Sequence, residues 1–322
     1  MNKKTKGWLI VAVVMLLSGL FLFLGVVMAT DGGFDRPFKD RETTQTYPVI
    51  HSFHDIYVEA DTDDISLTYF PSFDDTVEVV CRESENVSYS VNVEDNTLMI
   101  RLVDQRKWYD HISWFSESSS LQIRLPQEVY GNLTIKADTS DIELHKDLSF
   151  NSVDVSVTTG DVLCFASASK DVRIHGGTGT VRVENANVKN LDIDVSTGKV
   201  TVKSVSCTGD LTLGLTTGDT YLKDILCQNL VSTGSTGDLR MEDIRVKGKL
   251  TADRSTGDVS LSRSSAEEIV ITTDTGDVSG SLSEPMIFYT ASDTGDISVP
   301  QSTIGGLCKI TTDTGDIFFT AP

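Results

Sequence analysis

The chain has 322 residues, and its 47 Asp and Glu residues outnumber its 27 Lys and Arg residues, for a formal net charge of −20. This balance excludes nucleic-acid binding, which needs clustered Lys and Arg, and it disfavours direct adsorption to anionic lipid. Neither the five cysteines nor the five histidines show a metal-ligand spacing such as Cys-x-x-Cys or His-x-x-x-His.

The N-terminus predicts a membrane anchor. Lys3, Lys4 and Lys6 precede an uncharged run at residues 8–29. As a helix this run reaches about 33 Å, enough for a bilayer core of about 30 Å. We predict a cytoplasmic stub at 1–7, a transmembrane signal anchor at 8–29 and an extracytoplasmic remainder. Cleavage after Ala29 is the alternative, although the apolar run is longer than a usual signal-peptide core.

Residues 30–45 are polar and predict a linker, and residues 46–130 predict an irregular β-rich lead-in. Strand candidates in the lead-in are residues 77–81, 87–93 and 98–103. An aromatic cluster runs from Lys107 to Phe115. It predicts a satellite core or a cap over the first coil, with an exposed platform for a glycan or a partner as the alternative.

From residue 131 to residue 322 the chain repeats. A Thr followed by a tight-turn residue recurs ten times between Thr139 and Asp316, always 19 or 20 residues apart. A constant period of this length predicts a stacked-repeat architecture. The turn residues are Ser140, Gly160, Gly179, Gly198, Gly218, Gly237, Gly257, Gly276, Gly295 and Gly315.

The pattern inside each repeat predicts its strands. Counted from the turn residue, positions −7, −5, −3 and −1 alternate with polar residues, and apolar residues return at +2, +4 and near +7. Each coil therefore has two strands and a shorter third segment. A unit of this size buries its apolar face only by stacking. We predict an all-β fold, a parallel β-solenoid of about ten coils spaced about 4.8 Å apart, of unspecified handedness.

The turn chemistry supports corners. Gly supplies a positive φ without steric cost, and the Asp that follows it can bond nearby backbone N–H groups. The first coil has Ser140 in place of Gly, and an earlier segment, Ile56 to Ile65, repeats the pattern with Asp63 at the turn. We expect some backbone strain at both residues.

These repeated Thr-Gly-Asp corners follow a lead-in that reads Leu121-Gln122-Ile123-Arg124-Leu125-Pro126. Together they resemble a bacterial β-strand-repeat family of unknown function, known as "putative adhesins", which includes LiaG-like membrane proteins. The resemblance covers roughly residues 50–322. It implies a cell-surface protein, sometimes linked to envelope-stress systems, and it offers no catalytic residues. Thr180 and Lys199, where Asp is expected, and Arg254 at position −3 depart from the pattern.

Two columns carry candidate chemistry. Six successive coils, from Asp219 to Asp316, place Asp directly after the turn. We predict solvated turns there, with a divalent cation such as Ca²⁺ as the alternative. Cys207 and Cys227 both lie at +9, where in-register stacking is expected and a disulfide is the alternative. Cys81, Cys164 and Cys308 are expected to behave as small hydrophobic residues.

The sequence predicts no catalytic, cofactor-binding or metal-binding residue. The evenly repeated carboxylates single out no coil, which disfavours a polysaccharide-active enzyme. We predict a non-catalytic, membrane-anchored cell-surface protein, an adhesin or envelope scaffold that binds a wall polymer, a glycan or a membrane protein. The alternative is an accessory protein in envelope-stress signalling, which would act through a membrane partner because the stub is too short for an output domain.

The last coil in the sequence, Ile310 to Phe319, shows no polar cap. An uncovered strand edge invites pairing with another chain. The sequence therefore predicts self-association, or a partner, at that coil.

Overall fold

The computed structural model describes residues 14–20, 43–50, 52–71, 76–83, 87–104 and 120–320. Residues 14–20 are helical, but within these ranges no helix combines the length and the hydropathy of a membrane span. Most of the predicted anchor, most of the predicted linker and the whole aromatic cluster from Lys107 to Phe115 lie outside the described residues. The anchor and the role of the cluster therefore stay predictions.

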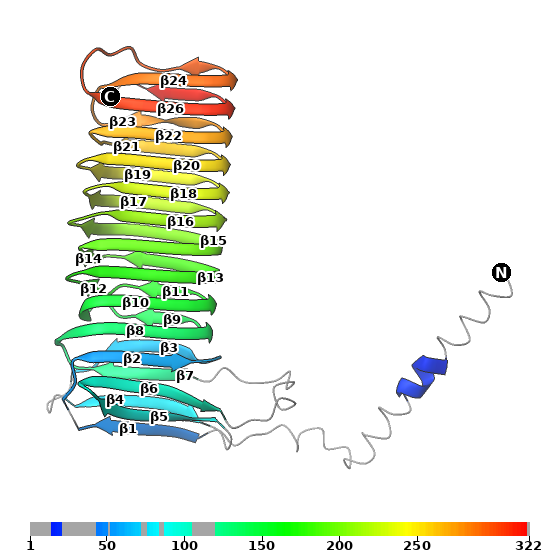
Figure 1. Cartoon of the computed structure of the whole chain (residues 1–322), viewed down its shortest axis with the longest axis vertical. Coiled ribbons are helices and arrows are strands. Elements are labelled where there is room, and N and C mark those ends of the chain that lie inside the picture. Colours follow the sequence, from blue (N-terminus) through cyan, green and yellow to red (C-terminus); the bar gives the residue numbers. More distant parts are fainter. Residues whose placement is uncertain are drawn as a thin grey trace.

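The described strands form one sheet that winds into a single stack (Figure 1). Every pairing from β8 onward is parallel, so the predicted β-solenoid of about ten coils is confirmed. The first face of the stack contains β2 (Asp55–Ala60), β8 (Val129–Thr139), β10 (Ser149–Thr159), the first half of β13 (Asp171–Glu184), the first half of β15 (Asn190–Cys207), β16 (Leu211–Thr217), β18 (Leu230–Thr236), β20 (Lys249–Thr256), β22 (Glu268–Thr275), β24 (Met286–Thr294) and β26 (Gly306–Thr314).

The second face follows the turn residue in each coil. It contains β3 (Asp64–Tyr69), β9 (Ile142–Leu144), β11 (Val162–Cys164), the second parts of β13 and β15, β17 (Thr220–Cys227), β19 (Leu239–Val246), β21 (Val259–Ser264), β23 (Val278–Leu282), β25 (Ile297–Ser298) and β27 (Ile317–Thr320). The short third side contains β12 (Ser167–Ala168), β14 (Asn187–Val188) and the ends of the longer second-face strands.

The core forms as the pattern predicts. Positions −7, −5, +2 and +4 point inward, and their side chains are almost fully buried along most of the stack, whereas Ile297 is exposed in the β24/β25 coil at its end. The coils match position by position, as in the register Val153, Val172, Leu191 and Leu211. Parallel stacking buries each coil's apolar face against the next coil, which is how a 19-residue repeat gains a core.

Position −1 is an exception to the predicted alternation. All ten Thr residues at this position are exposed, as is the residue before each of them in most coils. The strand therefore leaves its alternation after position −3, and the two residues before the turn both point outward. The prediction that position −1 faces the core is wrong. The threonines instead form an in-register ridge beside the corner.

The corner between the second face and the short third side, which we call the third corner, contains residues that the sequence analysis did not single out. At position +6, five successive coils have a non-glycine residue with positive φ: Asn185, Ser204, Asp224, Asp243 and Arg263. This left-handed residue shifts the inward alternation by one position. Side chains at +7 and +9, such as Ile244 and Val246, then point into the core, which confirms the predicted third apolar segment.

The stacking order departs from the chain order near the N-terminus. The coil formed by β2 and β3 lies between the β8/β9 coil and a layer made of β6 (Thr97–Asp104) and β7 (Ser120–Leu125). Below that layer, β4 (Val77–Glu83) pairs antiparallel with β7 and with β1 (Thr43–Val49), and β5 (Val87–Glu94) pairs antiparallel with β6. The Asp63 segment is therefore a true coil, as its pattern predicted.

The C-terminal end is also out of chain order. Strands β26 and β27 lie between the β22/β23 coil and the β24/β25 coil, which forms the end of the stack (Figure 1). Ile310 and Ile317 are fully buried. The expectation that the coil from Ile310 to Phe319 leaves an uncovered edge is therefore wrong, because the chain itself covers that coil with β24 and β25.

Candidate functional site

The first polar feature is the Asp column, defined as the residues directly after the turn. In spatial order these are Asp64, Asp141, Asp161, Thr180, Lys199, Asp219, Asp238, Asp258, Asp277, Asp316 and Asp296. Each Asp except Asp296, which lies in the last coil of the stack, accepts a backbone hydrogen bond from the next coil. Asp258 N donates to Asp238 Oδ1 at 2.9 Å, and Asp277 N donates to Asp258 Oδ1 at 2.9 Å.

This ladder agrees with the predicted solvated turn. The carboxylate satisfies a backbone N–H group that the corner leaves without a strand partner. Within the described residues, no group of three His, Cys, Asp or Glu side chains is arranged to hold a metal ion. The ladder therefore gives the column a role in coil-to-coil stacking.

The expected strain at the first two turns is absent. Neither Asp63 nor Ser140 has a positive φ. Both side chains are buried, and Tyr89 Oη donates a hydrogen bond to Asp63 Oδ2. The prediction of backbone strain at these two residues is wrong, because these corners turn within ordinary backbone space.

A second ladder lies at position −8, and the sequence reasoning missed it. Asn190 Nδ2 donates to Asp171 Oδ1 at 2.8 Å, and Asp210 N donates to Asn190 Oδ1 at 3.0 Å. Asn229 Nδ2 then donates to Asp210 Oδ1 at 2.8 Å. Asp and Asn recur eight residues before the turn, and this recurrence is the signal that could have revealed the ladder.

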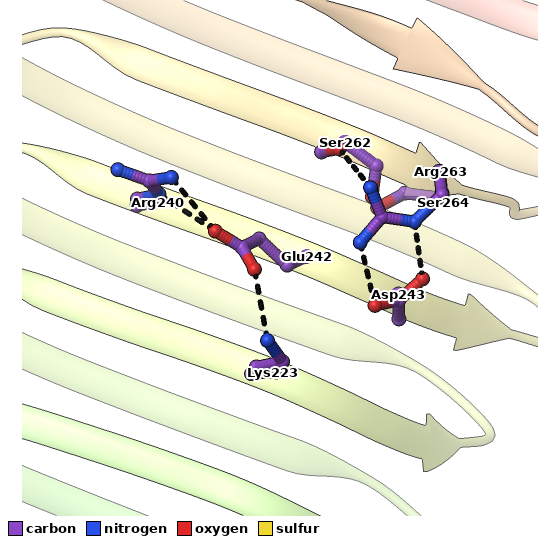
Figure 2. Close-up of polar contacts among 7 residues, drawn as sticks. All are labelled: Lys223, Arg240, Glu242, Asp243, Ser262, Arg263 and Ser264. Atoms are coloured by element: carbon purple, nitrogen blue, oxygen red, sulfur yellow. Dashed lines mark hydrogen bonds and ion pairs between the residues drawn. The ribbon is translucent and has the colours of Figure 1, made fainter.

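The third feature is a charged face on the second side of the stack (Figure 2). We define it by Arg182, Glu184, Lys203, Tyr221, Lys223, Arg240, Glu242, Asp243 and Arg263. Glu242 joins two coils: Lys223 Nζ lies 3.3 Å from its Oε2, and Arg240 lies 2.8 Å from its Oε1. Burial alone would raise the pKa of Glu242, but hydrogen bonds from Lys223 and Arg240 lower it overall.

Arg263 binds Asp243 in the coil below with two hydrogen bonds, of 2.7 and 2.8 Å, as Figure 2 shows. These hydrogen bonds hold the pKa of the Asp243 carboxyl below its usual range. A bidentate pair of this kind fixes orientation as well as charge. Both residues occupy the left-handed third corner, so the pair ties two corners together.

Lower on the same face, Glu184 pairs with Arg182 at 2.7 Å and with Lys203 of the next coil at 3.7 Å. Lys203 Nζ and Arg240 Cζ lie 5.4 and 6.0 Å from the centre of the Tyr221 ring, on the coils at either side. Basic side chains from successive coils therefore lie on this face of a strongly acidic chain. Each of these contacts links residues of one coil or of two adjacent coils.

Arg254 is a charge inside the core. It lies at position −3 and is almost fully buried, and its guanidinium donates to Ser232 Oγ at 2.9 Å and to the Asp253 carbonyl at 2.8 Å. Burial lowers its pKa to about 10. Gly234 in the coil below provides the space that the guanidinium occupies, since a Cβ at this position would lie only 3.2 Å from the Arg254 Cζ atom.

All five cysteines are buried and free, so Cys207 and Cys227 stack at +9 without a disulfide. Burial raises the pKa of Cys164, Cys207, Cys227 and Cys308 to about 12. Burial, together with Glu83 and Asp63, raises the pKa of Cys81 to about 12. These thiols behave as the small core residues that the sequence predicted.

A small apolar pocket of about 240 Å³ lies at the N-terminal end of the stack. It opens between β1 and the β5/β6 hairpin, and Tyr47, Val49, Val91, Val93 and Leu98 line much of it. Its walls are the side chains that close this end of the core.

The stack, its corner ladders and its cross-coil ion pairs define an all-β repeat protein of the parallel β-solenoid class. The chain belongs to the Toastrack DUF4097 family, whose model matches residues 53–225 and 209–322. This confirms the resemblance to a β-repeat family of unknown function.

The chain is also similar to solved structures, at low identity. A "putative adhesin" of Bacteroides fragilis is 14% identical, with 88% of this chain and 99% of that chain covered and a TM-score of 0.45. A "putative lipid binding protein" of Parabacteroides distasonis is 12% identical, with 87% and 98% covered and a TM-score of 0.47. A "putative adhesin" of the same organism is 15% identical, with 88% and 98% covered and a TM-score of 0.32. No curated protein matches the chain.

Proposed function

We propose that this protein is a non-catalytic cell-surface rod, anchored in the membrane by residues 8–29, that acts as an adhesin or envelope scaffold. The observation that supports this most directly is the continuous parallel register from β8 to β27. Such a stack builds a long rigid side rather than a cleft, and extended surfaces are what repeat proteins use for binding.

The arrangement of the polar side chains disfavours an enzyme. Catalysis needs a local convergence of acid, base or nucleophile around a site for a reacting atom. Here all carboxylates of the Asp column except that of Asp296 accept a backbone hydrogen bond, as Asp238 and Asp258 do, and those of the charged face pair with cations. These carboxylates therefore stabilise the stacking of the coils.

The charged face is our candidate for the binding side. The chain carries a net charge of −20, so most of its surface repels an anionic wall polymer. The charged face instead presents Arg182, Lys203, Lys223, Arg240 and Arg263 across successive coils. Arg side chains beside carboxylates and a tyrosine can also bond sugar hydroxyls or a protein surface.

Site-directed photocrosslinking in cells tests this proposal. Ser255 and Ser260 lie on opposite sides of one corner, on β20 and β21. Each would be changed to Cys in the full chain and labelled with a thiol-reactive photocrosslinker. The native cysteines should not react with the label because they are buried.

The label at Ser260→Cys, beside the charged face, is expected to capture wall polymer or a surface protein, and the label at Ser255→Cys is the matched control. Capture of a sensor kinase or transporter at Ser260→Cys would favour the signalling alternative. Equal capture by both labels, or capture by neither, would contradict binding through the charged face.

A further inference from the structure

We propose that the outer edge of β24 docks β24 of a second copy of this chain, in antiparallel register, so that two rods join tip to tip. The adhesion between two facing surfaces that this pairing would produce rests on the proposed function. The pairing itself rests on the end of the stack.

The edge is open. β24 pairs with β26 on one side, and β25 pairs with β27. In the described part of the chain, no strand pairs with β24 or β25 on the outer side. Nine residues, Met286–Thr294, thus present every second N–H and C=O group at the tip.

The edge also lacks the usual protection against pairing. Natural edge strands are blunted by Lys, by Pro or by bulges. β24 reads Met-Ile-Phe-Tyr-Thr-Ala-Ser-Asp-Thr, with Asp293 as its single charge. At the opposite end, β1 contains Pro48, and the outermost strands turn antiparallel. That end is unsuited to continue the parallel stack, which disfavours head-to-tail chains.

Apolar side chains surround this tip. Tyr289 on β24 is 63% exposed, and Ile304, in the segment that leads into β26, is 69% exposed. Ile297 on β25 is also exposed. Phe288 is half-buried and contacts Phe319 at a centroid distance of 5.4 Å. Exposed apolar groups beside an unpaired strand are typical of an association surface.

The sequence of β24 is compatible with itself in antiparallel register. If the two-fold axis passes through Thr290, Tyr289 lies opposite the second copy's Ala291, so a large side chain meets a small one. Asp293 lies opposite Ile287, so the two Asp293 carboxylates stay apart. Side-by-side association through the corner that carries the Asp column would instead bring two Asp columns together, which like-charge repulsion opposes.

The geometry places the β1 strands of the two copies at opposite ends. In each copy the chain enters the stack at β1, at the far end from β24 (Figure 1). Two rods joined at β24 would therefore have their β1 strands, which follow the predicted anchors in the sequence, at the two far ends. If the protein is anchored as proposed, this arrangement joins two facing surfaces rather than two neighbours on one surface.

Disulfide trapping of the full chain tests the pairing. At the two-fold axis the two Cα atoms of residue 290 would lie about 5 Å apart, within the Cα range of a disulfide. Mild oxidation of Thr290→Cys is expected to yield a covalent dimer on a non-reducing gel. Thr233→Cys, an exposed position in the middle of the stack, is the control for random collisions between accessible thiols and should remain a monomer.

A charge variant tests the same register without a new thiol. Tyr289→Glu combined with Ala291→Glu would place carboxylates opposite one another, and self-association measured by sedimentation should weaken at least tenfold. Thr233→Glu combined with Ser235→Glu adds the same charge elsewhere and should leave association unchanged. A wild-type chain that stays monomeric at high concentration, or equal trapping at positions 290 and 233, would overturn the pairing.

Vesicles that carry the full chain separate this inference from the proposed function. Two vesicle populations should aggregate only when both carry the wild-type chain, and the double Glu variant at β24 should abolish aggregation. If the vesicles stay dispersed while the label at Ser260→Cys still captures a partner, the tip-to-tip inference fails and the proposed function stands.

Discussion

Arg254 is a charged residue at a position that neighbouring coils fill with small or apolar side chains such as Gly234 and Leu215. Its site is adapted to it, since Ser232 accepts a hydrogen bond and Gly234 leaves space. In this structure the guanidinium has hydroxyl and carbonyl partners, Ser232 and Asp253, in place of a carboxylate. Buried charges of this kind are often less stabilising than apolar side chains of similar volume.

We predict that Arg254→Met stabilises the fold by about 1–3 kcal/mol. The pKa of Arg254, lowered to about 10, corresponds to a cost of about 3 kcal/mol at neutral pH, partly offset by its hydrogen bonds. Guanidinium-induced unfolding measures the difference. Arg254→Ala is the control, because it removes the charge but leaves a cavity that cancels the gain.

The same residue predicts a pH dependence. A base with a lowered folded-state pKa destabilises the fold fully at pH values below that pKa, and the cost falls as the pH rises through it. The advantage of Arg254→Met should therefore be constant from pH 7 to 9 and should shrink above pH 10. An advantage that grows above pH 10 would contradict this explanation.

Gly237 illustrates why the corner requires glycine. Its φ is 124°, and a Cβ there would lie 2.1 Å from the Gly218 carbonyl oxygen of the coil below. We predict that Gly237→Ala costs about 3 kcal/mol or more, from backbone strain and the clash. Gly176→Ala is the control: its Cβ would meet Val195 at an ordinary 3.5 Å, and the change should be close to neutral. The melting temperatures of the two variants, compared with that of the wild type, test this prediction.

At the scale of the element, the Asp column combines hydrogen bonding with repulsion. We predict that Asp258→Ala lowers stability by about 1 kcal/mol, because Asp277 N loses its acceptor. Asp258→Asn keeps an oxygen acceptor and removes a charge between Asp238 and Asp277. It should be at least as stable as the wild type in low salt, with the gain fading at high salt. A destabilised Asn variant would show that the charge itself is needed.

The cation alternative for the Asp column has its own measurement. If the column is only a ladder of hydrogen bonds, calcium should leave the melting temperature unchanged at constant ionic strength. A rise that saturates with calcium, and that Asp258→Asn weakens, would indicate that neighbouring carboxylates share the ion.

At the scale of the whole molecule, the stack should tolerate the loss of one complete coil. Deleting residues 198–217 joins Thr197 to Gly218 and preserves the corner sequence. It also places Glu184 opposite Lys223, because both occupy the register position of Lys203. We predict a folded chain, shorter by about 4.8 Å in small-angle scattering.

Deletion of residues 198–207 alone removes part of a coil and serves as the control. It breaks the register between the first and second faces, so every later side chain would be displaced relative to the core. This variant should fail to fold. Equal tolerance of both deletions would mean that the repeat is not the unit of stability.

Much of the fold could be predicted because its cause is local. The Thr-Gly-Asp corner and the buried positions −7, −5, +2 and +4 recur in most coils, so one coil's pattern predicts the others. The exposure of Thr236 and its equivalents was missed because Thr suits both a buried and an exposed strand end. The left-handed residues at +6 were missed because side chains such as Arg263 and Ser204 carry no glycine-like signal.

The candidate site was only partly predictable. The Asp column follows from a period in the sequence, whereas the charged face needs the register that brings Lys223 against Glu242 and Asp243 against Arg263, residues about one coil apart. No motif marks these pairs, because an ion pair depends on distance across the sheet and not on spacing within one strand.

The sequence by itself determined the repeat, the corners, the buried face and the acidic character, because each follows from residue types at a constant period. Only the tertiary structure decided which coil lies beside which: β2 above β6, and β26 beneath β24. The physical reason is that parallel coils share one backbone edge. Any coil can pair with any other, so the order depends on how side chains at both ends pack and not on the period.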